Sequence, residues 1–91
     1  MYLEIVSPEA KLFSGEVESI TVPGALGSFQ VLNNHAPIVS TLINGKVKIQ
    51  GNIKLDDFNK LILIQEGNDT FFEIQSGVLE MRDNKVILLT D

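Results

Sequence analysis

Several residue types that catalytic and metal sites depend on are missing or rare in this sequence. Among its 91 residues there is no cysteine and no tryptophan, and there is a single histidine, His35. The absence of cysteine excludes disulfides, thiolate nucleophiles and thiolate metal ligands. A zinc site needs roughly three or four ligands. No acidic residue lies within ten positions of His35, so the sequence near it offers no zinc site.

Basic residues and long apolar runs are also scarce. Seven Lys and Arg face twelve Asp and Glu, which gives a net charge of −5. This balance argues against binding nucleic acid or anionic lipid, because both need a basic stripe. The longest apolar runs, such as Leu61–Ile64, fall far short of the ~20 residues of a membrane helix. We therefore expect any association with a membrane to come through a partner.

What the chain does contain is a repeated strand pattern. Short segments rich in Val, Ile, Leu and Phe end at turn residues, and no window shows helical periodicity. The length fits one domain, residues 1–91. About ten short strands at this spacing predict an all-β fold, an antiparallel β-sandwich or flattened barrel. The expected strands are Tyr2–Val6, Lys11–Phe13, Val17–Val22, Ser28–Leu32, Ile38–Leu42, Lys46–Gln50, Ile53–Leu55, Leu61–Gln65, Thr70–Gln75, Val78–Arg82 and Lys85–Thr90.

Details of the pattern predict faces and turns. Val47 and Ile49 alternate with lysines, so we expect them to point inward. Pro23-Gly24 fits the centre of a type II turn, and Asn44-Gly45 fits a type I′ hairpin turn. Leu61–Gln65 is apolar on both faces, which predicts a central strand.

The irregular residues gather in one stretch, Thr21–Leu42, which is where a specific surface is expected. Gly24–Gly27 lacks the helix or the Lys-Ser/Thr pair that a phosphate loop needs. His35 lacks an orienting carboxylate, and the nearby serines do not stand in a nucleophile elbow. We interpret His35 as a loop residue that hydrogen-bonds backbone around Pro37.

Four pieces of the sequence carry a more specific signal when they are taken in order. They are Ile5–Pro8 with Phe13–Val17, Val22–Gly27, His35–Ile38, and Ser76–Glu80 with Val86–Asp91. Together they resemble the opening motif, the Pro-Gly turn, the His-Ala-Pro signature and the closing strands of a known family. That family is the N-terminal β-sandwich domain of the epsilon subunit of F-type ATP synthases, called delta in mitochondria. Each motif is short, so the resemblance depends on their order along nearly the whole chain.

The sequence departs from the family pattern in four places. Gln30 stands where a glycine usually precedes the third strand. Asn33-Asn34 stands where Pro-Gly or Asn-Gly usually precedes the histidine. The stretch between Asn44-Gly45 and the closing motifs is longer than usual, which predicts a lengthened or added hairpin around Lys46–Lys60. The chain stops at Asp91, where the family's C-terminal helical hairpin would begin. We therefore expect no helix-mediated inhibition from these residues.

The resemblance implies a non-catalytic subunit of the central stalk, or rotor. Such a subunit packs on the gamma subunit and the c-ring, reaches the catalytic head through the complex, and supports coupling of proton flow to ATP synthesis. It implies no cofactor, no metal and a peripheral place on the cytoplasmic face of a bacterial membrane. Such contacts need a large surface, so we expect one apolar sheet face or edge to be incompletely buried. The expected partner-contact residues, in the Gly24–Asn34 loop and the next turn, are Ser28, Phe29, Asn33, Asn34, His35 and Asn44.

Two other functions are compatible with a small β-sandwich. One is a generic module that binds a ligand or another protein. A carbohydrate-binding module would present an exposed aromatic platform, whereas this chain has one tyrosine and no tryptophan. The other is a small hydrolase that uses His35 and a serine.

Overall fold

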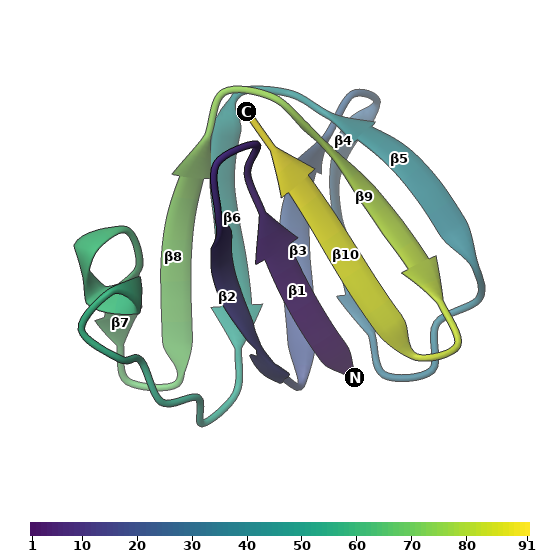
Figure 1. Ribbon diagram of the computed structural model, residues 1–91. Coiled ribbons are helices and arrows are strands. Elements are labelled where there is room, and N and C mark those ends of the chain that lie inside the picture. Colours follow the sequence, from purple (N-terminus) through teal and green to yellow (C-terminus); the bar gives the residue numbers. More distant parts are fainter.

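The computed structural model describes residues 1–91 as ten strands and one short 3-10 helix, η1. The prediction of an all-β fold is therefore confirmed (Figure 1). The elements are β1 (Tyr2–Val6), β2 (Lys11–Glu16), β3 (Ser19–Gly24), β4 (Gly27–Leu32), β5 (Ile38–Leu42), β6 (Gly45–Gln50), η1 (Asn59–Leu61), β7 (Ile64–Glu66), β8 (Asp69–Ile74), β9 (Gly77–Arg82) and β10 (Lys85–Thr90).

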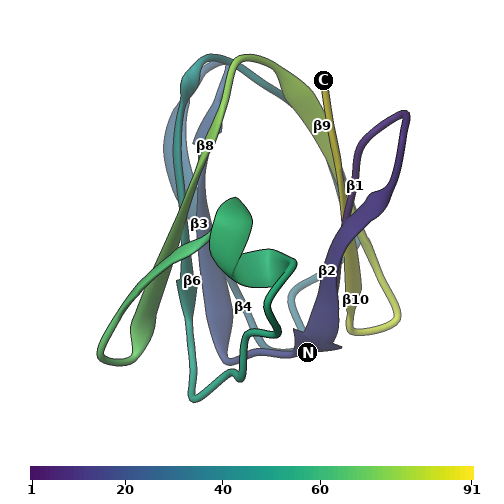
Figure 2. The same ribbon diagram turned by 60° about the vertical axis from the view of Figure 1, so that its left-hand side comes forward.

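The strands form one sheet that curls into two facing layers (Figure 2). One layer has the order β2-β1-β10-β9-β5, and the other has the order β4-β3-β6-β8-β7. The layers join where Gly24 of β3 pairs with Leu42 of β5. β1 and β10 run parallel, side by side in Figure 1, and the other pairs are antiparallel. The structure is thus the expected β-sandwich with one parallel pair.

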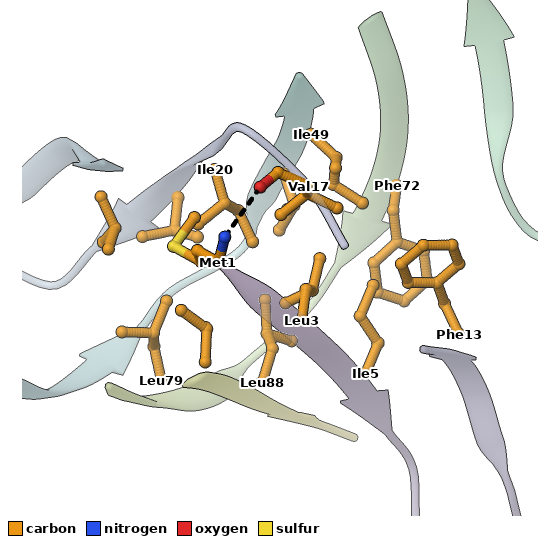
Figure 3. Packing of buried hydrophobic residues seen from close by; sticks show 14 of the residues in the cluster. Met1, Leu3, Ile5, Phe13, Val17, Ile20, Ile49, Phe72, Leu79 and Leu88 are labelled. Atoms are coloured by element: carbon orange, nitrogen blue, oxygen red, sulfur yellow. Dashed lines mark hydrogen bonds between the residues drawn. The ribbon is translucent and has the colours of Figure 1, made fainter. Parts of the chain in front are cut away.

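The core lies between the layers. Leu3 and Leu88 from the first layer face Ile20 and Ile49 from the second, and all four are fully buried (Figure 3). Val47 is fully buried too, which confirms the inward face predicted for β6. The strand alternation therefore identified the core correctly, because side chains of a strand point to its two faces in turn.

The entry to β1 is held by two backbone contacts. The amino nitrogen of Met1 donates to the carbonyl oxygen of Val17 at 3.2 Å, as the dashed line in Figure 3 shows. The Val17 amide donates to the Met1 carbonyl at 2.9 Å. These bonds fix the start of β1 against the end of β2 and bring both apolar side chains into the core.

The predicted turn at Pro23-Gly24 is wrong, because both residues belong to β3. The strand pairs with β4 as far as Gly24, opposite Gly27, so the turn falls on the two residues between. Proline is tolerated here because β6 pairs with β3 only up to Thr21.

The predicted hairpin at Asn44-Gly45 is also wrong. Neither residue has a positive φ, and β5 and β6 do not pair with each other. The chain crosses there from one layer to the other. A type I′ turn is favoured where its twist matches two paired strands, and β5 and β6 are not paired. The turn with positive φ at both central residues is Asp83-Asn84 (52° and 58°), between β9 and β10.

The segment between β6 and β8 departs most from expectation. Ile53–Leu55 is not a strand, and Leu61–Gln65 forms the end of η1 and a short β7 at the sheet edge, not a central strand. The pattern misled because Ile53 and Leu63 point into the core without strand pairing. Residues 51–63 therefore form a core-covering segment in place of the predicted hairpin around Lys46–Lys60.

This segment spans the gap between the two free edges of the curled sheet, and η1 lies between the layers in Figure 2. The Asn59 side chain donates from Nδ2 to the Leu12 carbonyl of β2 at 2.6 Å. Its Oδ1 accepts from the Asp56 amide at 3.1 Å, and the Asn59 amide donates to the Asp56 carboxylate at 2.7 Å. One buried side chain thus ties the segment to the opposite layer.

Glu4 on β1 carries the closest ion pair. Its carboxylate lies 2.8 Å from Lys11 Nζ and 3.7 Å from Lys85 Nζ. The hydrogen bond from Lys11 and the charges of both lysines outweigh desolvation and lower the pKa of Glu4 below its usual 4.5. The pair links β1 to a neighbouring strand on each side.

We predict opposite outcomes for two adjacent leucines of β10. Leu88→Ala leaves a cavity in the core and should lower the free energy of unfolding by ~2–5 kcal/mol. Leu89→Ala, at a half-exposed position on the other face, should change it by less than ~1 kcal/mol. Urea denaturation measures both, and equal losses would contradict the assigned strand faces.

We also predict a pH-dependent contribution from Glu4. Because its pKa is lowered on folding, the stabilisation is present above pH 4.5 and is lost as pH falls through the folded-state pKa. Glu4→Gln should therefore be less stable than the parent at neutral pH and equally stable at pH 2. Urea midpoints across this range test it, with Glu80→Gln, an exposed acid of β9, as the control. A difference that persisted at pH 2 would contradict the ion-pair origin.

Candidate functional site

The β3–β4 turn forms a protruding tip. Its residues are Ala25 and Leu26, and the Leu26 side chain is fully exposed. The Ala25 amide donates to the Thr41 carbonyl at 3.0 Å, so the tip is anchored to β5. Gly24 needs to be glycine, because a Cβ there would lie 2.7 Å from the Gly27 carbonyl oxygen. The tip is therefore a defined shape with an apolar side chain at its apex.

Three of the expected contact residues lie at or beside this tip. Ser28 pairs with Pro23 just after the turn and is exposed. Asn44 lies at the same end, because the preceding Ile43 amide donates to the Pro23 carbonyl at 2.9 Å. Phe29 is half-buried, and a Cβ on Gly24 would come within 2.7 Å of its ring. Phe29 therefore supports the tip from below.

The other three expected residues lie at the opposite end of β4, about 20 Å away for a strand of this length. Asn33 Oδ1 accepts from Asn84 Nδ2 at 3.0 Å and from the Met1 amino group at 2.9 Å. The Asn34 amide donates to Asn84 Oδ1 at 2.7 Å. His35 is exposed, with Nδ1 2.7 Å from the Ala36 carbonyl oxygen, which confirms the predicted backbone contact.

The structure thus divides the expected residues into two groups at opposite ends of the molecule. One group, with Ser28 and Asn44, surrounds an apolar apex; the other ties the β4–β5 connection to the β9–β10 turn. Leu26 was missed by sequence reasoning, although an isolated leucine between Gly24 and Gly27 is a readable signal for an exposed tip.

A second surface lies on the outward face of β5, β9 and β10. Val78 pairs with Leu89 on one side and Thr41 on the other, so these side chains share a face with Val39. Val39 is 71% exposed, Leu89 48% and Val78 38%. We call Val39, Val78 and Leu89 the apolar face. The expectation of an incompletely buried apolar sheet face is confirmed, although the sequence had not identified its residues.

Groups able to do chemistry do not converge on either surface. The hollow at the tip is lined by Gly24, Ala25, Leu26, Gly27, Phe29, Val39, Ser40 and Thr41, which include no titratable group. On the apolar face, the exposed Glu80 lies opposite Val39 among valine and leucine side chains. No three His, Asp or Glu side chains gather in a way that could hold a metal ion. No helix has the length and apolar character to cross a membrane. Both surfaces have the composition of contact areas.

Comparisons with known proteins agree with this geometry. The family described as the beta-sandwich domain of the ATP synthase delta/epsilon chain matches residues 1–91. The chain is 38% identical to the ATP synthase epsilon chain of Chlorobium limicola over 89 residues, covering 98% of this chain and 86% of that relative. It is 37% identical to the epsilon chain of Leptospira borgpetersenii, again over 98% of this chain but only 59% of that relative.

Among solved structures, a chain from the central stalk/c-ring of the Tetrahymena thermophila mitochondrial ATP synthase superposes with a TM-score of 0.75. Sequence identity is 15%, and the match covers 98% of this chain and 61% of that one. A chain from the Euglena gracilis mitochondrial ATP synthase gives a TM-score of 0.72 at 21% identity, covering 97% of this chain and 48% of that one. These likenesses show a shared fold. With the family match over its whole length, the chain belongs to the delta/epsilon chain family of ATP synthases and forms its β-sandwich domain.

Proposed function

We propose that this chain is a non-catalytic subunit that packs on the gamma subunit and the c-ring and supports coupling of proton flow to ATP synthesis. As an epsilon-type chain it is part of the rotor stalk of F-type ATP synthase. In this role it lies peripherally on the cytoplasmic face of a bacterial membrane and reaches that membrane through its partners. The observation that carries the proposal is the apolar face on a domain whose family assembles into this complex.

The apolar face is assigned to the gamma subunit. Val39, Val78 and Leu89 lie on three adjacent strands, so they present one surface on a rigid sheet. Burying an apolar side chain contributes up to ~1.5–3 kcal/mol. A partner that covers all three side chains would gain the free energy of burying apolar surface that stays exposed in the domain alone.

The tip is assigned to the c-ring. Ser28 and Asn44 are polar, exposed and at one end, which suits contact with polar loops. Asn33, Asn34 and His35 follow β4 at its other end, so we assign the ring contact to the residues of the tip. For these three, the structure offers a role within the chain through Asn84 and the Ala36 carbonyl. They are therefore left out of the ring contact.

Co-purification tests the stalk function and the gamma assignment together. A tagged chain expressed in its own host should recover gamma and c-ring subunits from detergent-solubilised membranes. Val39→Asp places a carboxylate in the apolar face and should weaken the gamma contact by roughly tenfold or more. Its fold should be unchanged, because the position is exposed. Leu32→Asp, an exposed leucine at the far end of β4 and outside the apolar face, is the control and should recover gamma normally. Recovery of the unmutated chain alone would overturn the stalk function, and equal gamma recovery by both variants would overturn the assigned face.

Substitution at the tip should separate assembly from coupling. Ser28→Arg adds a bulky charge beside Leu26 without touching the core, so we expect normal recovery of gamma and reduced ATP-driven proton pumping per ATP hydrolysed. Proton pumping in inverted membrane vesicles, measured beside ATP hydrolysis, gives this ratio. Glu18→Arg, at an exposed position just before β3 and at the end of that strand remote from the tip, serves as the charge control. An unchanged ratio for Ser28→Arg would contradict the ring assignment.

A further inference from the structure

The β8 strand is paired along only half of one side. Its full length pairs with β6, from Asp69 opposite Gln50 to Ile74 opposite Gly45. On its other side β7 pairs only with residues 69–71, because the preceding residues turn away into η1. The backbone of Phe72–Ile74 therefore has a strand on one side and none on the other. Such a stretch is a template for another extended chain.

Two hollows flank this unpaired stretch. One, of about 430 Å³, lies against Ile64, Phe71 and Lys46 on the outward face of the sheet. The other, of about 380 Å³, lies toward β2 and the β1–β2 turn, and is lined in part by Leu12 and Ile74. Ile62, Phe72 and Glu73 line both. The hollows thus lie on either side of one short length of free backbone.

This arrangement fits an added strand. Successive side chains of a strand point to opposite faces, so neighbouring residues of an incoming segment would enter the two hollows in turn. The segment would continue the line of β7 beside β8, where the chain itself leaves the sheet at Leu63. Hydrogen bonds to the backbone would supply attraction. In a segment that alternates apolar and basic residues, one hollow would take the apolar side chains and the other would take the basic ones.

The charges around the stretch are mostly negative. The lining includes Glu66, Glu73, Glu9 and Asp91, against a single base, Lys46. All four carboxylates are exposed, and Lys46 lies over the Phe71 ring at 5.4 Å. An incoming segment with lysine or arginine between its apolar residues would complement this surface.

We propose that the free edge of β8 at Phe72–Ile74 binds an extended segment of a partner protein that alternates apolar and basic side chains. The segment adds as a strand antiparallel to β8 and places its side chains in the two hollows. The edge exists because residues 51–63 cover the core instead of pairing with β8, and β7 pairs only with residues 69–71. The surface is thus distinct from the apolar face and the tip.

A direct test uses a blocked seven-residue peptide that alternates valine and lysine, titrated into the ¹⁵N-labelled 91-residue chain. We expect amide signals of residues 64–75 to shift, and those of Phe72–Ile74 to gain protection against hydrogen exchange. A peptide alternating valine and glutamate should bind at least about fivefold more weakly because of the acidic surroundings. Glu73→Arg should reduce binding of the lysine peptide, whereas Glu80→Arg, outside both hollows, should leave it unchanged.

Several outcomes would overturn the proposal. They are no shift at millimolar peptide, equal binding of both peptides, or shifts confined to the other free edge at β2. If the same amides shifted on concentrating the chain without peptide, the edge would pair with a second copy and the partner segment would be rejected. None of these results bears on recovery of gamma and c-ring subunits, so this proposal and the stalk function fail separately.

Discussion

The curled sheet does not close, and the fold depends on how its two free edges are bridged. The bridge centres on Asn59, whose side chain bonds the Leu12 carbonyl of one layer while its backbone is held by Asp56. A buried polar group left without such partners costs ~1–3 kcal/mol, so the geometry of this residue is strongly specified. By holding residues 51–63 between the layers, it also brings Ile53 and Leu63 onto the core. Because the bridge leads the chain away from β8, residues Phe72–Ile74 have no neighbouring strand on that side.

The two layers present different surfaces, which suits a subunit held among several partners. The outward face of the first layer carries Val39, Val78 and Leu89, whereas β6 in the second carries Lys46 and Lys48 outward. Between them the core is filled by fully buried aliphatic side chains from both layers. Close-packed interiors transmit displacement with little deformation. A domain of this kind can transmit the movement of one partner to another with little change in its own shape.

Much of this fold follows from alternation along the strands, because burial of one face imposes a period of two. Val47 and Ile49 between lysines were predictable on that ground alone. Turns were less predictable. Pro23-Gly24 and Asn44-Gly45 are residue pairs typical of turns, but the course of the backbone at both places is determined by strand pairing between distant residues. The sequence predicted that an exposed apolar face exists, but it did not predict which residues form it. Which outward residues adjoin depends on strand order, and strand order is set by pairings between distant residues.

The parallel pairing of β1 with β10 affects when the first layer can fold during synthesis. Leu3 lies opposite Val86, so the centre of the first layer joins residues from the first and last strands. Contacts between residues so distant in sequence require closure of a long loop before they contribute stability, which places such folds among the slower ones. During synthesis the backbone of β1 has no parallel partner until β10 has left the ribosome. Most of the chain must therefore be made before the layer that carries the apolar face can assemble.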